Sequence, residues 1–180
     1  LLALAVGEAK YATVGTSAKY WAVWKEENLD QAALKRLASQ PLPSDVADRL
    51  FSGEFAEARP YFDKLGKKKI REITAQDVAL YSLCRPERLL DMARRFILFD
   101  GPVKKIARHQ QMFAVNDLLR RVQTRDESGR RDGGVVWPTQ GSGKSLTMVM
   151  LAKALAMTVR DARLVLVTDR TDLDKQVADT

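Results

Sequence analysis

Apolar positions in the first third of the chain predict a hairpin followed by short helices. Residues 2–6 and 9–14 are apolar or β-branched runs separated by a Gly-Glu pair, which is typical of a β-hairpin. Residues 30–40 place apolar side chains at helical spacing and are followed by prolines, so we expect a helix there. A second helix is expected over residues 44–50, with Ser44 as its N-cap.

The middle of the chain combines one irregular charged segment with three more helical patterns. Residues 54–75 contain a proline, a glycine and a run of lysines, which predicts a surface segment without regular structure. Apolar residues at helical spacing return over 76–84 and 86–97. A longer helix is expected from about Lys104 to Thr124. This part of the chain therefore reads as a mostly helical connector.

From residue 134 onward the pattern changes to that of an α/β protein. Residues 135–137 and 163–168 are short apolar runs with the character of buried strands. Between them, residues 144–159 form a helical pattern that is apolar almost all round, and 172–179 begin another helix. The order strand, loop, helix, strand, helix predicts the start of a parallel α/β sheet.

Composition restricts the classes of protein that the chain can represent. It has 180 residues, of which 46% are hydrophobic, so a packed core is expected. No apolar run approaches the roughly 20 residues needed to cross a bilayer, so no membrane association is predicted. Cys84 is the single cysteine, which excludes a disulfide scaffold and favours a cytoplasmic protein. The chain begins with leucine instead of methionine, so we expect it to be an internal fragment.

The charge balance is compatible with a polyanionic partner such as DNA. The net charge is +7, from 30 basic and 23 acidic residues. Basic residues cluster over 64–71, 104–108 and 120–131. Each cluster taken alone fits a solvated surface as well as a binding site.

The segment between the first predicted strand and the apolar helix has the pattern of a phosphate-binding loop. Gly141 and Gly143 allow a tight turn whose N–H groups can face phosphate oxygens. Lys144 can reach the β- and γ-phosphates, and Ser145 can offer its hydroxyl to Mg²⁺. The helix that follows adds the positive end of its dipole. The residues expected to bind ATP are Thr139, Gln140, Gly141, Ser142, Gly143, Lys144 and Ser145.

Polar residues on both sides of the loop extend this hypothesis. Gln110 and Gln111 lie upstream on the predicted long helix, at a distance suited to reading an adenine edge. Thr168, Asp169 and Arg170 follow the second predicted strand, where ligands bind in open α/β folds. From the residues alone, this downstream run could equally be an ordinary connection that caps a helix.

These stretches together resemble the restriction subunit of type I restriction enzymes, a superfamily-two DNA translocase fused to a nuclease. The resemblance rests mainly on residues 105–115, 136–148 and 168–176, and more loosely on 89–99 and 7–25. It implies an α/β fold: the start of a RecA-like P-loop motor domain, a helical connector before it, and a hairpin from the end of a nuclease domain. The expected boundaries are 1–28 for the nuclease end, 29–100 for the connector and 101–180 for the motor part.

The resemblance also implies roles for individual residues. Gln111 corresponds to the adenine-reading glutamine, because it lies three residues after an arginine. Lys144 is the expected catalytic residue, and Ser145 the expected Mg²⁺ ligand. Thr168, Asp169 and Arg170 fall in a run that contacts the DNA backbone in related motors.

The function implied is ATP-dependent DNA translocation coupled to endonucleolytic cleavage, with double-stranded DNA and the methylation and specificity subunits as partners. ATP and Mg²⁺ are the implied cofactors. The acidic motif and the arginines that complete such an ATP site are expected beyond Thr180, so this chain alone should be inactive.

Glu8 and Lys10 imitate part of a nuclease motif, but no aspartate precedes Asp30, so the nuclease residues are expected upstream of Leu1. A superfamily-two helicase without a nuclease, or a catalytically incomplete adaptor, remains the alternative function.

Overall fold

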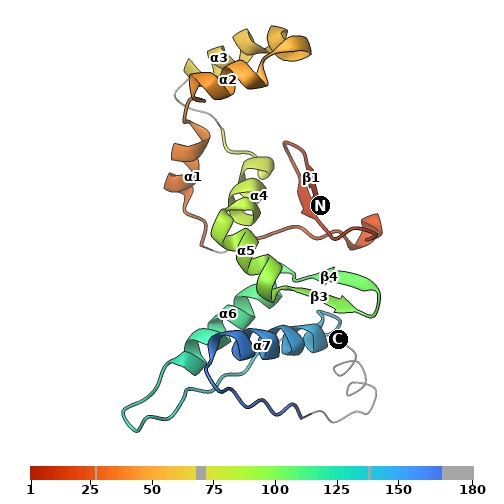
Figure 1. Ribbon diagram of the computed structural model, residues 1–180, viewed down its shortest axis with the longest axis vertical. Helices are drawn as coiled ribbons and strands as arrows, with labels where there is room; N and C mark the ends of the chain where they lie inside the picture. The colour runs from red at the N-terminus through yellow and green to blue at the C-terminus, as the bar shows by residue number, and fades with distance from the viewer. Residues whose placement is uncertain (27, 68–71, 138, 168–180) are drawn as a thin grey trace.

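The chain forms an elongated arrangement of short helices with two small hairpins (Figure 1). The computed structural model describes the whole chain except residues 27, 68–71, 138 and 168–180. The described part of the chain contains seven α-helices. They are α1 (Gln31–Ala38), α2 (Ser44–Leu50), α3 (Arg59–Lys67), α4 (Ala75–Cys84), α5 (Pro86–Arg95), α6 (His109–Gln123) and α7 (Lys144–Thr158), with short 3₁₀ turns at Ala18–Tyr20 and Gly53–Ala58.

The first hairpin confirms the prediction for the N-terminal residues. Strand β1 (Leu2–Leu4) pairs antiparallel with β2 (Ala9–Tyr11), so that Leu2 lies opposite Tyr11. The backbone of Tyr11 also forms a two-way bridge with Ala22, which adds a third extended segment to the pair.

A second hairpin replaces the start of the helix that was expected from Lys104. Strands β3 (Ile97–Asp100) and β4 (Val103–Ile106) pair antiparallel, and α6 begins only at His109. The turn between them needs Gly101, whose φ of 56° lies in the left-handed region. Ile106 packs against the core as part of strand β4, so the prediction that it lies on a helix is wrong.

The connector is more regular than its sequence indicated. Helices α1, α2, α4 and α5 lie close to their predicted positions. Ser44, however, is the first residue of α2 and not its N-cap, because Pro43 occupies that position. The segment expected to be irregular contains α3, in which Pro60 stands in the first turn, where a missing N–H costs little.

The parallel sheet predicted for the last third of the chain is not present in the described residues. Residues 135–137 and 163–167 have no strand assignment, and Val135, Trp137, Val165 and Val167 are more than 80% exposed. A central strand is stable only when it is paired on both edges, and neither run has a hydrogen-bonded neighbour strand within the part of the chain described. The predicted helix between the runs is confirmed as α7.

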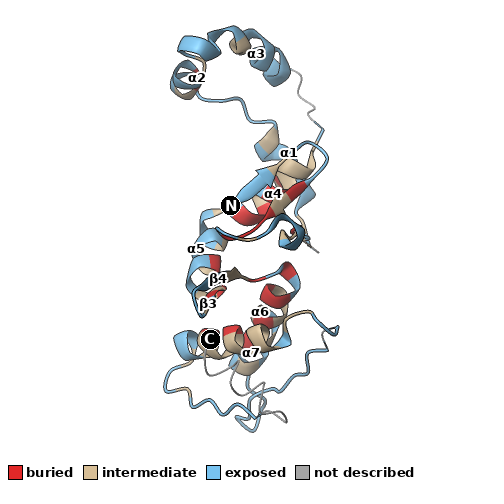
Figure 2. Ribbon diagram, turned by 90° about the vertical axis from the view of Figure 1, so that its right-hand side faces the viewer, coloured by how far each residue is buried: buried red, intermediate tan, exposed pale blue. Residues whose placement is uncertain are grey.

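The hydrophobic core joins the N-terminal segment to the last two helices. Buried residues concentrate around α4, α5, α6 and α7, whereas α2 and α3 are almost entirely exposed (Figure 2). Phe96, Met112, Val115 and Met150 are the largest apolar side chains that are completely or almost completely buried. The buried members of the core cluster are Tyr11, Trp24, Leu83, Met92, Phe96, Leu98, Ala107, Met112, Val115, Leu119, Met150 and Ala154.

Two polar contacts fix the N-terminal segment on the β4–α6 connection. The buried Tyr11 hydroxyl donates to the carbonyl of Ala107 at 2.8 Å, and the Thr13 hydroxyl donates to the carbonyl of Lys104 at 2.7 Å. Burial raises the pKa of the Tyr11 hydroxyl above its usual range, so it remains a donor at any physiological pH. These bonds satisfy backbone carbonyls that would otherwise be left without partners beside the core.

A largely buried ion pair joins the same segment to α5. Arg88 donates to both carboxylate oxygens of Glu26 at 2.9 and 3.2 Å, and the Trp24 indole N–H donates to Glu26 at 2.7 Å. The guanidinium also lies over the rings of Trp24 and Phe113, at 5.2 and 5.6 Å from their centres. The side chains of Arg88 and Glu26 expose only 14% and 10% of their surface, so the charge of each is compensated by the other.

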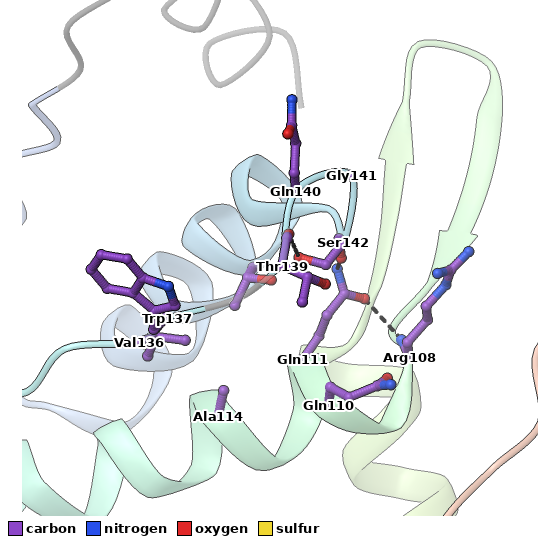
Figure 3. A pocket seen from close by; sticks show the side chains of 11 residues that line it. Arg108, Gln110, Gln111, Ala114, Val136, Trp137, Thr139, Gln140, Gly141 and Ser142 are labelled. Carbon is purple, nitrogen blue, oxygen red and sulfur yellow. Dashed lines mark hydrogen bonds between the residues drawn. The ribbon is translucent and has the colours of Figure 1, made fainter.

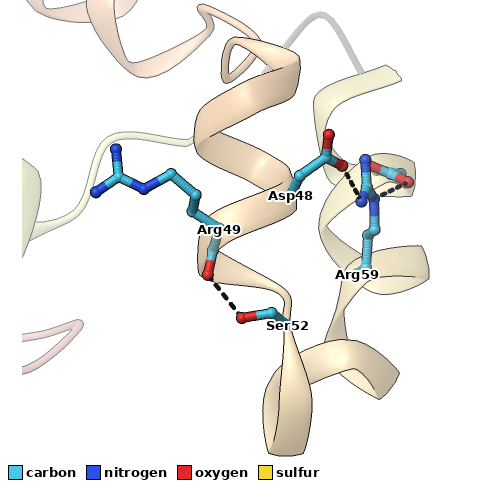
Figure 4. A network of polar contacts seen from close by, with 5 residues as sticks. Asp48, Arg49, Ser52 and Arg59 are labelled. Atoms are coloured by element: carbon cyan, nitrogen blue, oxygen red, sulfur yellow. Dashed lines mark hydrogen bonds and ion pairs between the residues drawn. The ribbon is translucent and has the colours of Figure 1, made fainter.

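We therefore expect Arg88→Met to lower the free energy of unfolding by about 3 kcal/mol, because Glu26 would remain buried without its partner. Urea unfolding followed by circular dichroism measures this change. Arg59→Met is the matched control, since Arg59 and Asp48 form an exposed ion pair at 2.5 Å between α2 and α3 (Figure 4). That control should leave stability nearly unchanged. Equal effects of the two substitutions would contradict the assignment.

Candidate nucleotide-binding site

The glycine-rich loop forms a compact turn that leads directly into α7. The hydroxyl of Ser142 donates to the carbonyl of Thr139 at 2.7 Å, and the Ser142 N–H donates to the same carbonyl at 3.3 Å. Gly141 and Gly143 have φ values of 75° and 83°, in the left-handed region that glycine adopts without strain. Gly143 is the N-cap of α7, and Lys144 is the first residue of the helix.

Gly143 is also the point where α6 approaches the loop most closely. A Cβ atom at this position would lie 2.7 Å from Nε2 of Gln111. The positive φ therefore favours glycine here, and a Cβ atom would also displace the Gln111 amide. Thr147 strengthens the same start of the helix by donating its hydroxyl to the Gly143 carbonyl at 3.0 Å.

Gln111 connects the beginning of α6 with this loop. Its side-chain oxygen accepts the backbone N–H of Arg108 at 2.8 Å. Its amide Nε2 donates to the carbonyls of Gly143 and Ser142 at 3.1 and 3.4 Å, as Figure 3 allows the reader to follow. Gln111 is buried, so these bonds form out of contact with bulk water. Both ends of the amide are thus engaged with the protein, and the adenine-reading role remains a prediction.

A cavity of about 510 Å³ opens between α6 and the loop. Five of the residues expected to bind ATP line it, and these are Gln111, Thr139, Gln140, Gly141 and Ser142. Arg108, Gln110, Ala114, Val136, Trp137 and Thr147 complete the lining. The sequence had not assigned Arg108, Trp137 or Thr147 to the site, although all three lie within or beside stretches that it had singled out.

Lys144 and Ser145 lie at the edge of this arrangement and do not line the cavity. Lys144 is exposed at the first position of α7 and forms no ion pair with another described residue. Its long side chain is therefore available to a ligand phosphate. Ser145 is partly buried in the same turn and can supply one oxygen to Mg²⁺, whose other ligands would be phosphate oxygens and waters.

The other candidate residues are not brought into this site. Thr168, Asp169 and Arg170 lie outside the described residues. Glu8 and Lys10 form a salt bridge with each other at 2.7 Å in the N-terminal hairpin. In the described part of the chain, no three His, Cys, Asp or Glu side chains are grouped as a metal site would require.

Most of the third basic cluster serves the local fold. Arg121 donates to the Gly133 carbonyl at 2.8 Å, Arg125 to Gly129 at 2.6 Å, and Arg131 to Val122 at 2.6 Å. The carboxylate of Asp126 accepts hydrogen bonds from Ser128 and Arg130, which lower its pKa. These contacts hold the 124–134 loop against α6.

Comparison with known proteins shows that the segment containing the loop is similar to an ATPase family. A model of the SWI2/SNF2 ATPase family matches residues 110–180, which contain Gln111, the loop and α7. In the part of the chain that the structure describes, no helix is long and apolar enough to span a membrane.

Curated relatives extend the similarity upstream of the loop. The chain is 42% identical over 109 residues to the type I restriction enzyme HindI endonuclease subunit of Haemophilus influenzae, covering 56% of this chain and 10% of the relative. It is 33% identical over 131 residues to a putative MjaIXP endonuclease subunit of Methanocaldococcus jannaschii, covering 69% and 12%. A Staphylococcus aureus endonuclease subunit, SauCOLORF180P, is 31% identical over 138 residues, covering 75% and 14%. No solved structure gives a significant match.

The part of the chain with a glycine-rich loop before an apolar helix, and with a glutamine held against the loop, is the part that is similar to SWI2/SNF2 ATPases. The chain is homologous to the endonuclease subunits of type I restriction enzymes, and the resemblance found in its sequence is confirmed. It spans 10–14% of the length of these three relatives.

The contacts of Gln111 predict how substitutions should act on the loop. Gln111→Leu should lower the free energy of unfolding by about 1–2 kcal/mol, because it removes hydrogen bonds on both sides of the amide. It should also speed hydrogen exchange at the loop amides of residues 141–143. Gln111→Glu retains the acceptor for Arg108 but removes the donor to Gly143, so the exchange should still accelerate. Gln110→Leu, at the exposed neighbouring position, is the control. Exchange that is equally slow in all four proteins would contradict the contact.

Proposed function

We propose that the chain is a segment of the restriction subunit of a type I restriction–modification system, in which ATP-driven translocation of DNA is coupled to endonucleolytic cleavage. The observation that carries this proposal is the loop at the start of α7, with its two left-handed glycines and the Gln111 amide against it. Support also comes from the ATPase family match and from the names of the curated relatives.

Different residues of the loop would bind different parts of the ATP–Mg²⁺ complex. The N–H groups of residues 141–144 and the positive end of α7 attract the phosphate oxygens. Lys144 neutralises charge that develops on the transferred phosphoryl group, which makes it the catalytic residue of this segment. Ser145 donates one oxygen ligand to the Mg²⁺ that the nucleotide brings, and bound Mg²⁺ supplies further charge neutralisation.

In this proposal the Gln111 amide binds either the loop carbonyls or the adenine edge. Its amide donates to the loop carbonyls in the present structure and would have to rotate to reach an adenine edge. Because the donor group is the same in both arrangements, exchanging a carbonyl for an adenine nitrogen conserves the hydrogen bond. Nucleotide binding would then release the loop from α6.

The remaining parts of the proposal concern groups outside the described site. Thr168, Asp169 and Arg170 would contact the backbone of double-stranded DNA, and methylation and specificity subunits would complete the assembly in the cytoplasm. Residues 1–28 would end the nuclease domain, 29–100 would connect it to the motor, and 101–180 would open the first motor lobe. The carboxylates that position water for hydrolysis would come from a later part of the subunit, so this segment would be inactive alone.

In the complete subunit, Lys144→Ala should reduce ATP hydrolysis and translocation by at least about 100-fold, because a charge at the phosphates is lost. Assembly with the other subunits should persist, since the Lys144 side chain is exposed and makes no ion pair with a described residue. Phosphate release assays and gel filtration measure the two outcomes. Lys64→Ala, on the exposed face of α3, is a matched control. Normal turnover by Lys144→Ala would contradict the proposal, and so would the absence of nucleotide binding by the unmodified protein, which would favour an adaptor.

A further inference from the structure

A second cavity, of about 270 Å³, lies beside the nucleotide cavity and has no assigned role. The N-terminal segment forms one wall with Lys19–Val23 and Lys25, and the start of α6 forms the other with Arg108–Gln110. Arg108 and Gln110 line both cavities, so the two are contiguous. Its two walls come from the first and the second half of the chain.

The lining of this cavity carries positive charge that forms no ion pair with a carboxylate of the described residues. Lys19, Lys25 and Arg108 are exposed, and none of them forms an ion pair with another described residue. The nearby carboxylate of Glu26 is already bound by Arg88 and by the Trp24 indole. Arg108 stands at the start of α6 in Figure 3 and lines both cavities, so its charge can act in either one. A concave surface with three cations that lack an ion-pair partner among the described residues favours a polyanion.

Aromatic side chains restrict the chemistry of the anion further. Tyr20 is 60% exposed and lies under the Lys19 ammonium, which is 4.8 Å from its ring centre. Trp21 lines the cavity beside it, and its indole N–H is used by the carbonyl of Thr16 at 3.0 Å, which fixes the ring. Cations beside open aromatic rings are the combination that binds single-stranded nucleic acid, because phosphates pair with the charges while unpaired bases stack. A free phosphate would need only the cations.

We propose that this basic and aromatic cavity binds a single strand of DNA, with phosphates on Lys19, Lys25 and Arg108 and a base stacked on Tyr20. The site is separate from the nucleotide loop but touches it, because Arg108 supplies the N–H that holds Gln111. A strand bound to Arg108 would therefore act on the residue whose backbone N–H holds Gln111 in place against the loop. The inference goes beyond the proposed ATP site and does not need that site to be active.

Binding of a short fluorescently labelled oligonucleotide to the full chain, measured by anisotropy at several salt concentrations, tests this site. We expect the double variant Lys19→Glu/Lys25→Glu to bind at least tenfold more weakly than the unmodified protein. The slope of log affinity against log salt should fall by about 1.4, since each lost phosphate contact on a single strand contributes about 0.7.

Substitution of the aromatic residue separates stacking from charge. Tyr20→Ala should weaken the oligonucleotide about tenfold with no change in the salt slope, and Tyr20→Trp should restore binding. The control Lys64→Glu/Lys67→Glu carries the same change of net charge on α3, which Figure 1 places at the other end of the molecule. This control should bind as the unmodified protein does.

Three outcomes would overturn the inference. The first is equal affinity of the unmodified protein and the Lys19/Lys25 variant, and the second is an equal loss in the α3 control, which would reduce the effect to net charge. The third is displacement of the oligonucleotide by millimolar inorganic phosphate, which would mean a site for the bare anion. A fluorescent ATP analogue reports the loop independently. Lys144→Ala should lose the analogue and keep the oligonucleotide, so failure of one site is distinguishable from failure of the other.

Discussion

The packing of α6 against α7 is the contact on which the rest of the candidate site depends. Met112 and Val115 of α6 share the core with Met150 and Ala154 of α7, and all four are almost completely buried. Burying a side chain such as Val or Met contributes roughly 1.5–3 kcal/mol. Because the loop ends at the first residue of α7 and Gln111 lies in the first turn of α6, this packing sets the distance across which the Gln111 amide reaches the loop.

The sequence predicted the local parts of the site well, because these depend on short-range chemistry. The tight turn at Gly141 and Gly143 and the helix after it follow from residue type and spacing, whereas the adenine-reading role of Gln111 stays a prediction. The β3–β4 hairpin was missed because Lys104-Lys105-Ile106 fits a helical pattern as well as a strand, and only the turn at Gly101 decides between them. Propensity alone could not distinguish these readings.

The remaining differences concern contacts between distant parts of the chain. The strands expected at 135–137 and 163–167 need partners that periodicity cannot supply. The bond between Gln111 and the Gly143 carbonyl joins residues 32 positions apart, and the Arg88–Glu26 pair joins residues 62 positions apart. No spacing rule predicts such pairs, so the second role of Gln111 and the cavity beside Arg108 became visible only in three dimensions.

The contacts that anchor the N-terminal segment also connect it mechanically to the nucleotide loop. Tyr11, Thr13 and Glu26 each bind a different element of the remaining fold, at Ala107, Lys104 and Arg88. A force along this segment would act on these three contacts. The Ala107 carbonyl lies one residue before Arg108, whose N–H the Gln111 side chain accepts. Ala107 lies four residues before Gln111, so tension on the hairpin would be transmitted over a short stretch of chain to the amide that binds the loop. This part of the chain is therefore suited to transmitting force.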